Sequence, residues 1–452
     1  MSEADPTTFA ALRDVLLLSN WNTRVVILGV AALGASGGAV GSFMLLRRRA
    51  LLGDALSHAT LPGIVICFLV ATMLGFSGKS FAILLPGALL SGVLGVFFIQ
   101  FITRVGRLSE DAALGIVLST FFGAGIALLG LAQQETTASA AGLESFIYGK
   151  TASMLAQDAT LIAIVGLASI VLCLLLFKEL RLICFDKAFA SGQGLPTTLL
   201  DLILMSMVVA VVIVGLQAVG LILVIAILVI PAAAARFWTD STMRMFLTAL
   251  FIGGFSAWIG AAASAVMSKL PAGAMIVLVM AAFFVVSMLF GQRRGILRQA
   301  LQLRRAKLTM ERDHALRAVW ELLEDSGRPE CLATDIGTHT GWGTLRVIQR
   351  LEGEGHLKRV LGSGDERISL TPAGERLARD VVRRHRLWEH YLIRRADFDA
   401  SHVDRGADEL EHLLPAEILQ ELEAELQAEN QPLPASPHLI QSPAKPRPGG
   451  SQ

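Results

Sequence analysis

The sequence has little charge and few cysteines for its 452 residues. Charged residues make up 17% of the chain, against 53% for hydrophobic residues. The four cysteines include no CxxC pair, which argues against a disulfide framework or a zinc ribbon. The sequence GxxxxGK[ST] is absent, so the chain does not bind a nucleotide through a P-loop. The N-terminus lacks a basic start followed by an apolar core and a cleavage site, and we expect no removable signal peptide.

The apolar residues form blocks long enough to cross a bilayer, which takes about 20 residues in a helix. These blocks lie at 25–46, 55–75, 81–102, 112–132, 159–177, 199–215, 218–235, 245–267 and 272–290. Only Gly215-Leu216-Gln217 interrupts 199–235, so eight spans are the alternative to nine if one block is re-entrant. We therefore expect an all-α polytopic membrane protein with eight or nine transmembrane helices over residues 25–292, after an N-terminal segment at 1–24.

Lysine and arginine are unevenly divided between alternate connections of these blocks. One set of connections contains Arg47, Arg48, Arg49, Arg104, Arg107, Lys178, Arg181, Lys187, Arg236 and Arg244. The other set contains only Lys79, Lys150 and Lys269. Because positively charged connections tend to stay in the cytoplasm, we expect the N-terminus outside and the C-terminal half inside.

A carboxylate and an imidazole lie four residues apart in the second block, at Asp54 and His58. Residues at this spacing share one face of a helix. Ionisable groups inside a membrane segment are costly, so they usually line a pathway or bind an ion. Aspartate and imidazole suit Mn²⁺, Fe²⁺ or Zn²⁺, and the lack of a thiolate here argues against Cu⁺. The alternative is a solvated pair at the cytoplasmic edge, with Asp54 capping a helix.

Two connections between blocks have a functional and an ordinary interpretation. Residues 230–240 contain Pro231, which breaks or kinks a helix, and a short helix there is a candidate for docking on a partner. The ordinary alternative is an interfacial helix anchored by Arg236 and Trp238. The polar segment 133–158, on the outer side, is either a contact for an external binding protein or a plain loop.

The C-terminal half predicts a soluble domain of a different kind. A basic linker at 293–309 is consistent with a flank of the inner leaflet. A helical pattern at 314–325 comes first. Residues 331–337, a turn at Thr340-Gly341 and a second helix at 342–353 then have helix-turn-helix spacing. A hairpin pattern follows, with strands at 357–360 and 367–370. We expect an α+β winged-helix domain over 310–375.

A helical region at 376–428 follows, and it carries potential metal ligands at helical spacing. These residues are His385 with Glu389, and Asp408 with Glu411 and His412. The alternative is an amphipathic helix whose polar face is merely solvated. The tail at 429–452 is rich in Pro, Ser and Gly, and we expect it to be disordered.

Several stretches of the apolar half make residues 25–298 resemble the ABC-transporter permeases for manganese, zinc and iron. These stretches are 53–63, 110–116, 215–220, 230–235 and 270–273. The resemblance implies a dimeric permease of the bacterial inner membrane, homo- or heterodimeric, with a cytoplasmic ATPase and an external solute-binding protein as partners. It implies that Asp54 and His58 bind the transported ion together with the same pair of the partner permease. It also implies that the connection 231–243 couples to the ATPase, with Pro231, Ala234, Arg236 and Thr239 as contact residues.

The stretches 383–392 and 408–412 make residues 310–427 resemble the iron- and manganese-dependent repressors of the diphtheria-toxin-repressor type. This resemblance implies a helical dimerisation region and a regulatory Mn or Fe site. The implied ligands are His385, Glu389, Asp404, Asp408, Glu411 and His412. The first helix of these repressors also supplies ligands, and the corresponding positions here are His314 and Arg317. An arginine does not ligate a metal, so we expect this site to be altered or incomplete.

DNA binding by the winged helix would fall on Thr344, Arg346 and Arg350. The same region contains Glu352, Glu354, Asp365 and Glu366, whereas a nucleic-acid surface is consistently basic. We therefore expect this domain to sense metal or to aid dimerisation of a transport subunit that is not itself an enzyme. The rival interpretations are a membrane-tethered, metal-dependent transcriptional regulator and a permease for a metal chelate. The sequence does not distinguish Mn²⁺, Zn²⁺ and Fe²⁺.

Overall fold

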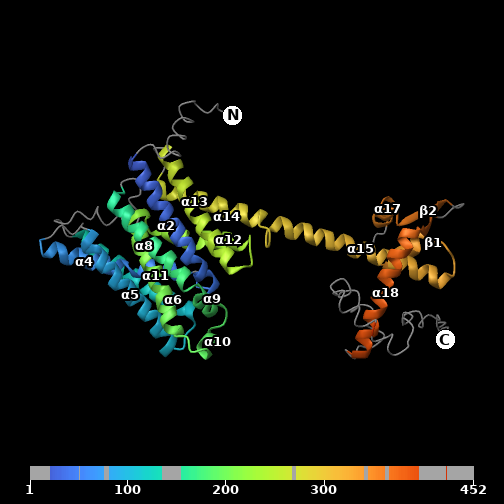
Figure 1. Cartoon of the computed structure of the whole chain (residues 1–452), viewed down its shortest axis with the longest axis horizontal. Helices are drawn as coiled ribbons and strands as arrows, with labels where there is room; N and C mark the ends of the chain where they lie inside the picture. Colours follow the sequence, from blue (N-terminus) through green and yellow to red (C-terminus); the bar gives the residue numbers. More distant parts are fainter. Residues whose placement is uncertain are drawn as a thin grey trace, which may run out of the picture. The chain divides into compact units, whose positions relative to one another are not determined.

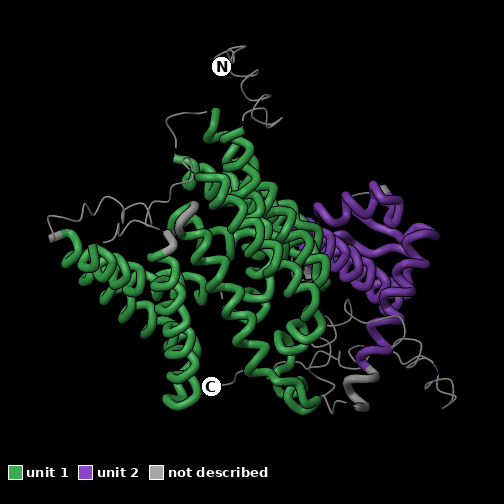
Figure 2. Tube along the Cα trace, turned by 60° about the vertical axis from the view of Figure 1, so that its left-hand side comes forward, with its two compact units in different colours: residues 1–299 green, residues 300–452 purple. Residues whose placement is uncertain are grey.

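The computed structural model describes residues 21–49, 51–75, 81–134, 154–266, 271–340, 345–361 and 366–395, together with Ala424. The chain divides into two compact units, residues 1–299 (unit 1) and residues 300–452 (unit 2), which are coloured separately in Figure 2. Unit 1 contains the apolar blocks and unit 2 contains the charged half of the sequence, so each unit is described by itself.

The described part of unit 1 is built from helices (Figure 1). They are α2 (Trp21–Leu46), α3 (Leu52–Ala59), α4 (Leu61–Met73), α5 (Phe81–Val105), α6 (Glu110–Gln134), α8 (Ala156–Leu175), α9 (Phe177–Phe185), α10 (Lys187–Gly192), α11 (Thr197–Val219), α12 (Leu221–Arg236), α13 (Thr242–Val266) and α14 (Ala272–Phe290). Within the described residues, 8 segments are long and apolar enough to cross a membrane, and α3 and α4 together form one of them. The apolar helix Leu223–Arg236 is shorter. The expected polytopic helical fold is confirmed, with α12 as the segment that separates a count of eight from a count of nine.

The long apolar stretch 199–235 is divided at Gly220. This residue has φ 83° and ψ 169°, a backbone conformation that glycine adopts without the steric cost of a side chain. The sequence analysis expected the break at Gly215-Leu216-Gln217, but α11 continues through those residues to Val219. The apolar pattern does not locate this break, because the helix ends at the backbone conformation of Gly220 and not at the less hydrophobic residues 215–217.

A break between α3 and α4 follows from Pro62. Proline has no N–H, so residue 62 cannot donate to the carbonyl of His58 four residues earlier. The N–H of Thr60 donates to the carbonyl of Leu56 at 3.2 Å, and α4 begins at Leu61 with the proline in its first turn. The short helix α3, which carries Asp54 and His58, therefore ends directly after the imidazole.

Helix α2 packs closely against α12 and α13, and glycine makes this approach possible. A Cβ atom at Gly41 would lie 1.8 Å from the carbonyl oxygen of Leu228, and a Cβ at Gly38 would lie 2.3 Å from that of Ala249. Small residues at such positions allow the backbones of membrane helices to come into contact. Around this contact, Phe43, Phe177 and Phe246 form an aromatic cluster with ring centroids 5.6 to 5.9 Å apart.

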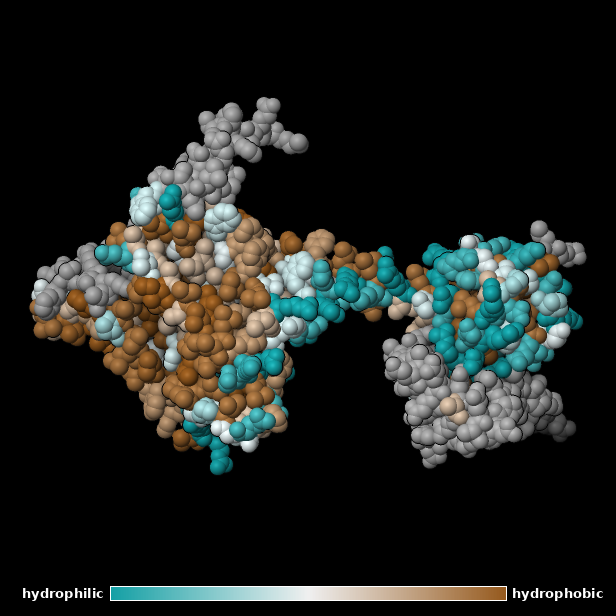
Figure 3. All heavy atoms as spheres, in the orientation of Figure 1, coloured by the Kyte–Doolittle hydropathy of each residue, from teal (hydrophilic) through white to brown (hydrophobic). Residues whose placement is uncertain are grey.

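The surface of unit 1 is dominated by hydrophobic side chains, as Figure 3 shows in brown. Large apolar side chains are exposed along several spans, including Leu90 and Phe97 of α5, Leu167 of α8 and Phe251 of α13. An apolar exterior of this extent is unusual for a soluble protein and normal for helices that face lipid.

Unit 2 is a winged helix followed by a long helix, as the sequence predicts over 310–375. Its elements are α15 (Ile296–Ser326), β1 (Cys331–Leu332), α16 (Ala333–Thr340), α17 (Leu345–Gly353), β2 (Leu357–Leu361), β3 (Glu366–Leu370) and α18 (Pro372–Arg395). The strands form an antiparallel sheet in the order β1-β3-β2, with Arg359 and Cys331 both opposite Ile368. The core contains Leu316, Val319, Ile336, Ile348, Leu351 and Ile368, all at most 3% exposed.

Helix α15 begins much earlier than the pattern at 314–325 suggests. It starts at Ile296 and runs without a break to Ser326, so most of the basic segment 293–309 is helical. The boundary between the two units falls inside this helix, after Gln299. At the other end of the winged helix, α18 starts at Pro372, and Thr371 Oγ1 caps it by accepting from the N–H of Gly374 at 3.0 Å.

Candidate functional site

Asp54 and His58 lie on one face of α3, as their spacing predicts. Nε2 of His58 is 3.2 Å from Oδ1 of Asp54, and the two side chains are 15% and 31% exposed respectively. Both are therefore partly shielded but accessible. A carboxylate oxygen and an imidazole nitrogen at this separation are placed to bind one divalent cation between them.

Among the described residues, the other ring nitrogen of His58 has no hydrogen-bond partner. Nδ1 is buried, and no described residue hydrogen-bonds to it. The imidazole is instead held by its ring, which makes an edge contact with Phe122 of α6 at 4.7 Å between centroids. Nε2 of His58 faces Asp54, and Nδ1 has no hydrogen-bond partner within the described residues, so one ring nitrogen is open to a ligand.

The C-terminal end of α3 is fixed by hydrogen bonds to its backbone carbonyls. Ser91 Oγ of α5 donates to the carbonyl of Ala59 at 2.6 Å, and Thr60 Oγ1 donates to the carbonyl of Ser57 at 2.7 Å. Ser57 Oγ in turn donates to the carbonyl of Asp54 at 2.8 Å. These contacts satisfy carbonyls that the helix end leaves open, and they hold the pair on a rigid segment.

Two ligands do not complete a metal site. Within the described residues, no group of three or more His, Cys, Asp or Glu side chains is arranged to hold a metal ion. Structural zinc sites have four ligands, and manganese takes more. The geometry of one chain therefore leaves room for ligands from elsewhere.

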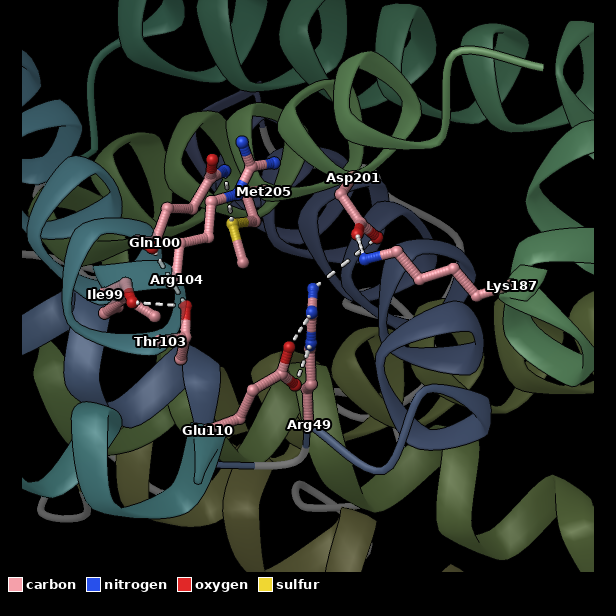
Figure 4. A pocket seen from close by; sticks show the side chains of 9 residues that line it. All are labelled: Arg49, Ile99, Gln100, Thr103, Arg104, Glu110, Lys187, Asp201 and Met205. Atoms are coloured by element: carbon pink, nitrogen blue, oxygen red, sulfur yellow. Dashed lines mark hydrogen bonds and ion pairs between the residues drawn. The ribbon is translucent and has the colours of Figure 1, made fainter. Parts of the chain in front are cut away.

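A polar cavity of about 190 Å³ lies at the ends of α5, α6, α10 and α11, close to the start of α3 (Figure 4). Arg49 is 6% exposed, and its guanidinium faces both oxygens of Glu110, with Nε 2.6 Å from Oε2. Asp201 receives Lys187 at 2.9 Å and Arg49 at 3.7 Å. From the sequence, Arg49 and Lys187 served only to predict the orientation of the chain in the membrane. This ion-pair network was not predicted, although the carboxylates of Glu110 and Asp201, which are rare beside apolar blocks, could have indicated it.

The four residues expected to couple to an ATPase do not form a separate helix. Pro231 lies inside α12, which continues to Arg236, and a short turn at 237–241 leads into α13. Pro231, Ala234 and Thr239 are buried, whereas the side chain of Arg236 is 32% exposed. The exposed charged residue of this turn is Asp240, which lies 3.4 to 4.0 Å from three arginines: Arg236, Arg293 and Arg294.

The turn 237–241 is fastened to α14 and to the segment that follows it. Nε1 of Trp238 donates to Ser287 Oγ at 2.9 Å. The carbonyl of Phe237 accepts from the N–H groups of Arg293 and Arg294 at 3.0 and 3.3 Å. This part of unit 1 is therefore held in one conformation by backbone as well as side-chain contacts.

Of the expected regulatory metal ligands, the structure describes the side chains of His385 and Glu389. Both are buried on α18, and Nε2 of His385 is 3.3 Å from Oε1 of Glu389. Arg317 of α15 faces the same imidazole: its Nη1 lies 2.7 Å from Nδ1 and 3.0 Å from Nε2. The other expected ligands lie outside the described residues: Asp404, Asp408, Glu411 and His412.

The residues expected to contact DNA differ in how accessible their side chains are. Thr344 lies outside the described residues, and Arg346 is exposed on α17. Arg350 is engaged within the unit: Nη2 donates to the carbonyl of Leu308 at 2.5 Å, and Nε lies 3.3 Å from Glu354. A guanidinium committed to these partners is poorly placed to read a base.

Comparisons with known proteins agree with this architecture. Residues 21–291 match the ABC 3 transport family, and residues 371–432 match the iron dependent repressor, metal binding and dimerisation domain. The chain is 38% identical over 310 residues to the manganese transport system membrane protein MntC of Bacillus subtilis (strain 168), covering 68% of this chain and 70% of that protein. It is 42% identical over 295 residues to the zinc transport system membrane protein TroC of Treponema pallidum (strain Nichols), covering 65% of this chain and 97% of that protein.

A solved structure shares the fold of the apolar half. PsaBC from Streptococcus pneumoniae, determined in complex with Fab, contains a chain with 29% sequence identity and a TM-score of 0.55. The match covers 65% of this chain and 99% of that chain. The chain therefore belongs to the ABC 3 transport family of metal transport permeases, and it carries an iron-dependent-repressor domain at its C-terminal end.

Proposed function

We propose that this chain is the permease subunit of an ABC importer for a divalent transition metal: manganese, zinc or iron. The observation that carries the proposal is the close pair of Asp54 and His58 on α3, inside a membrane span of a chain from this family. Relatives named as manganese and zinc transport proteins support the substrate class. The ion is the cargo of the pathway, not a resident cofactor.

A second permease subunit completes the proposed ion site. Two chains that each present one carboxylate and one imidazole supply four ligands. A transport site must bind its ion well enough to admit it and weakly enough to release it. A site divided between two subunits meets this need, because a small displacement of one subunit separates the ligands. The second subunit is either a copy of this chain or a related permease.

The remaining partners follow from what this chain lacks and where it is charged. Without a P-loop, it depends on a cytoplasmic ATPase subunit for nucleotide hydrolysis. The end of α12 and the turn 237–241, including Arg236 and Thr239, form the proposed contact with that ATPase. An external solute-binding protein delivers the metal. We propose that this turn and the C-terminal unit lie on the cytoplasmic side of the inner membrane, because arginine-rich connections tend to stay in the cytoplasm.

The test is metal uptake by Asp54→Ala and His58→Ala variants. Both side chains are partly exposed, so we expect normal membrane insertion and abolished uptake. Uptake is measured with radioactive manganese, zinc and iron in competition, which also identifies the preferred metal. Asp111→Ala, which removes an exposed carboxylate from the first turn of α6, is the matched control. Normal uptake by both pair variants removes the assignment.

For the C-terminal unit, we propose a role in metal sensing or in dimerisation of the permease, and not in repression. The engagement of Arg350 with Leu308 and Glu354 supports this preference. A gel-shift experiment with the full chain in detergent, with and without Mn²⁺, tests it. Metal-dependent, sequence-specific DNA binding contradicts the proposal and favours a membrane-tethered regulator.

A further inference from the structure

The interface between α15 and α18 buries a cation where the repressor resemblance places a metal ion. The side chains of His385 and Glu389 are 1% and 2% exposed, and that of Arg317 is 12% exposed. Nη1 of Arg317 lies within 3.0 Å of both ring nitrogens of His385. Glu321, one turn further along α15, is 3.7 Å from Nε of the same arginine. The guanidinium thus lies among an imidazole and buried carboxylates.

A metal ion does not fit into this arrangement. A bound metal would lie about 2.0–2.2 Å from an imidazole nitrogen. The guanidinium nitrogen is already 2.7 Å from Nδ1 and 3.0 Å from Nε2, so a metal ion bound to either nitrogen would lie close to the charge of Arg317. Arginine stays protonated in proteins, so its charge would also repel a divalent cation in a poorly solvated interface. The charge at position 317 therefore opposes binding of the ion at this imidazole.

The neighbouring acidic residues of α15 also have arginine partners. Asp313 is buried and accepts from Arg312 at 2.8 to 2.9 Å, and Arg384 of α18 is 3.8 Å away. Glu324 pairs with Arg386 of α18. Carboxylates from α15 that might ligate a metal at this interface are thus already neutralised by guanidinium groups.

We propose that Arg317 is a built-in replacement for the regulatory metal ion at His385 and Glu389. The guanidinium supplies a positive charge beside the buried pair of His385 and Glu389, and it joins α15 to α18 through its contacts with the His385 ring instead of coordination bonds. Docking of α18 on α15 is therefore permanent, and it does not depend on cytoplasmic metal at this site. Of the two roles proposed for the C-terminal unit, this favours dimerisation over sensing.

The experiment measures Mn²⁺ binding by the full chain in detergent, using the electron paramagnetic resonance signal of free Mn²⁺. All proteins carry Asp54→Ala and His58→Ala, so that the transport pair does not contribute. In this background we expect His385→Ala and Glu389→Gln to leave the number of bound Mn²⁺ ions per chain unchanged. Loss of a bound ion in either variant overturns the proposal, because it shows that the pair binds metal with Arg317 in place.

Arg317→Glu is the complementary variant, since it exchanges the internal cation for a ligand. We expect it to bind about one additional Mn²⁺ per chain, and we expect His385→Ala in the same chain to remove that ion. Arg376→Glu, an identical exchange on the exposed side of α18, is the control and should add no site. A folded Arg317→Glu chain that gains no Mn²⁺ contradicts the proposal. If that variant does not fold, the His385→Ala and Glu389→Gln measurements decide alone.

Discussion

Oδ1 of Asp201 lies 2.5 Å from Nη2 of Arg47, and the two side chains are 8% and 10% exposed. The same carboxylate also receives Lys187 from α10 and Arg49 from the connection that leads into α3. One buried anion at the start of α11 is therefore shared by three cations from two other parts of the chain. Removing one member of a buried, hydrogen-bonded ion pair costs far more than removing a surface pair, because the remaining charge stays buried.

We expect Asp201→Ala to lower the free energy of unfolding by about 3–5 kcal/mol, since Arg47 and Arg49 remain in a poorly solvated site. Chemical unfolding of the purified protein in detergent measures this loss. Lys187→Ala is the control, because that side chain is 50% exposed and its pair with Asp201 contributes about 0–1 kcal/mol. Equal effects of the two substitutions contradict the prediction.

The contact of α2 with α12 and α13 should tolerate no side chain larger than hydrogen. A methyl group at Gly41 or Gly38 would overlap backbone carbonyls, which cannot rotate away as a flexible side chain can. We expect Gly41→Ala and Gly38→Ala each to destabilise the protein by about 1–3 kcal/mol or more. Gel filtration of detergent extracts, with the folded peak quantified, measures the effect. Gly130→Ala is the control, because no neighbouring atom lies within 4 Å of its Cβ position.

The thiol of Cys331 should be protected from alkylation in the folded protein. Burial of this residue in β1, followed by the charge of Asp335, raises its pKa to about 11. The thiolate is the reactive form, so we expect slow modification at pH 8 and about a tenfold faster rate for each pH unit above it. Mass spectrometry after iodoacetamide treatment measures the rate. Modification at pH 8 that is as fast in the folded as in the denatured chain contradicts the prediction.

The raised pKa of Cys331 also has a consequence for stability. The folded protein holds this proton more tightly than the unfolded chain, so the contribution is fully present below the ordinary thiol pKa. It is lost as the pH rises toward 11. Cys331→Ala should remove this part of the alkaline dependence, which unfolding at pH 8 and at pH 10 compares directly.

Asp240 offers a test of the proposed ATPase contact that does not perturb the fold. Its three arginine partners are each more than 30% exposed, so their pairs contribute about 0–1 kcal/mol each. We expect Asp240→Ala to leave the unfolding midpoint nearly unchanged and to lower transport-coupled ATP hydrolysis in the assembled transporter. Asp111→Ala again serves as the control. Full coupling in the Asp240 variant would argue that the ATPase does not contact this turn.

Hydropathy and residue spacing predict much of this structure, because both report local physics. The apolar blocks became helices near their expected positions, and the hairpin at 357–370 formed because its strands alternate toward one core. The shared face of Asp54 and His58 follows from helical geometry alone. Their role in binding metal stays a prediction.

The structural features that the sequence did not predict depend on contacts between residues that are far apart in the chain. The break at Gly220 requires knowledge of its backbone angles, and the network around Asp201 joins residues more than 150 positions apart. Arg317 was recognised as a residue that cannot ligate a metal. That its guanidinium faces His385, 68 positions later, became visible only once α15 and α18 were packed together.

The carbonyl of Phe237 connects two segments of unit 1 through main-chain hydrogen bonds. Through the N–H groups of Arg293 and Arg294, it ties the turn between α12 and α13 to the residues immediately before α15. A displacement of this turn would therefore act on the backbone just before α15, the helix in which the boundary between the two units falls. If an ATPase subunit contacts this turn, as proposed, two main-chain hydrogen bonds link the contact surface to the residues that precede α15.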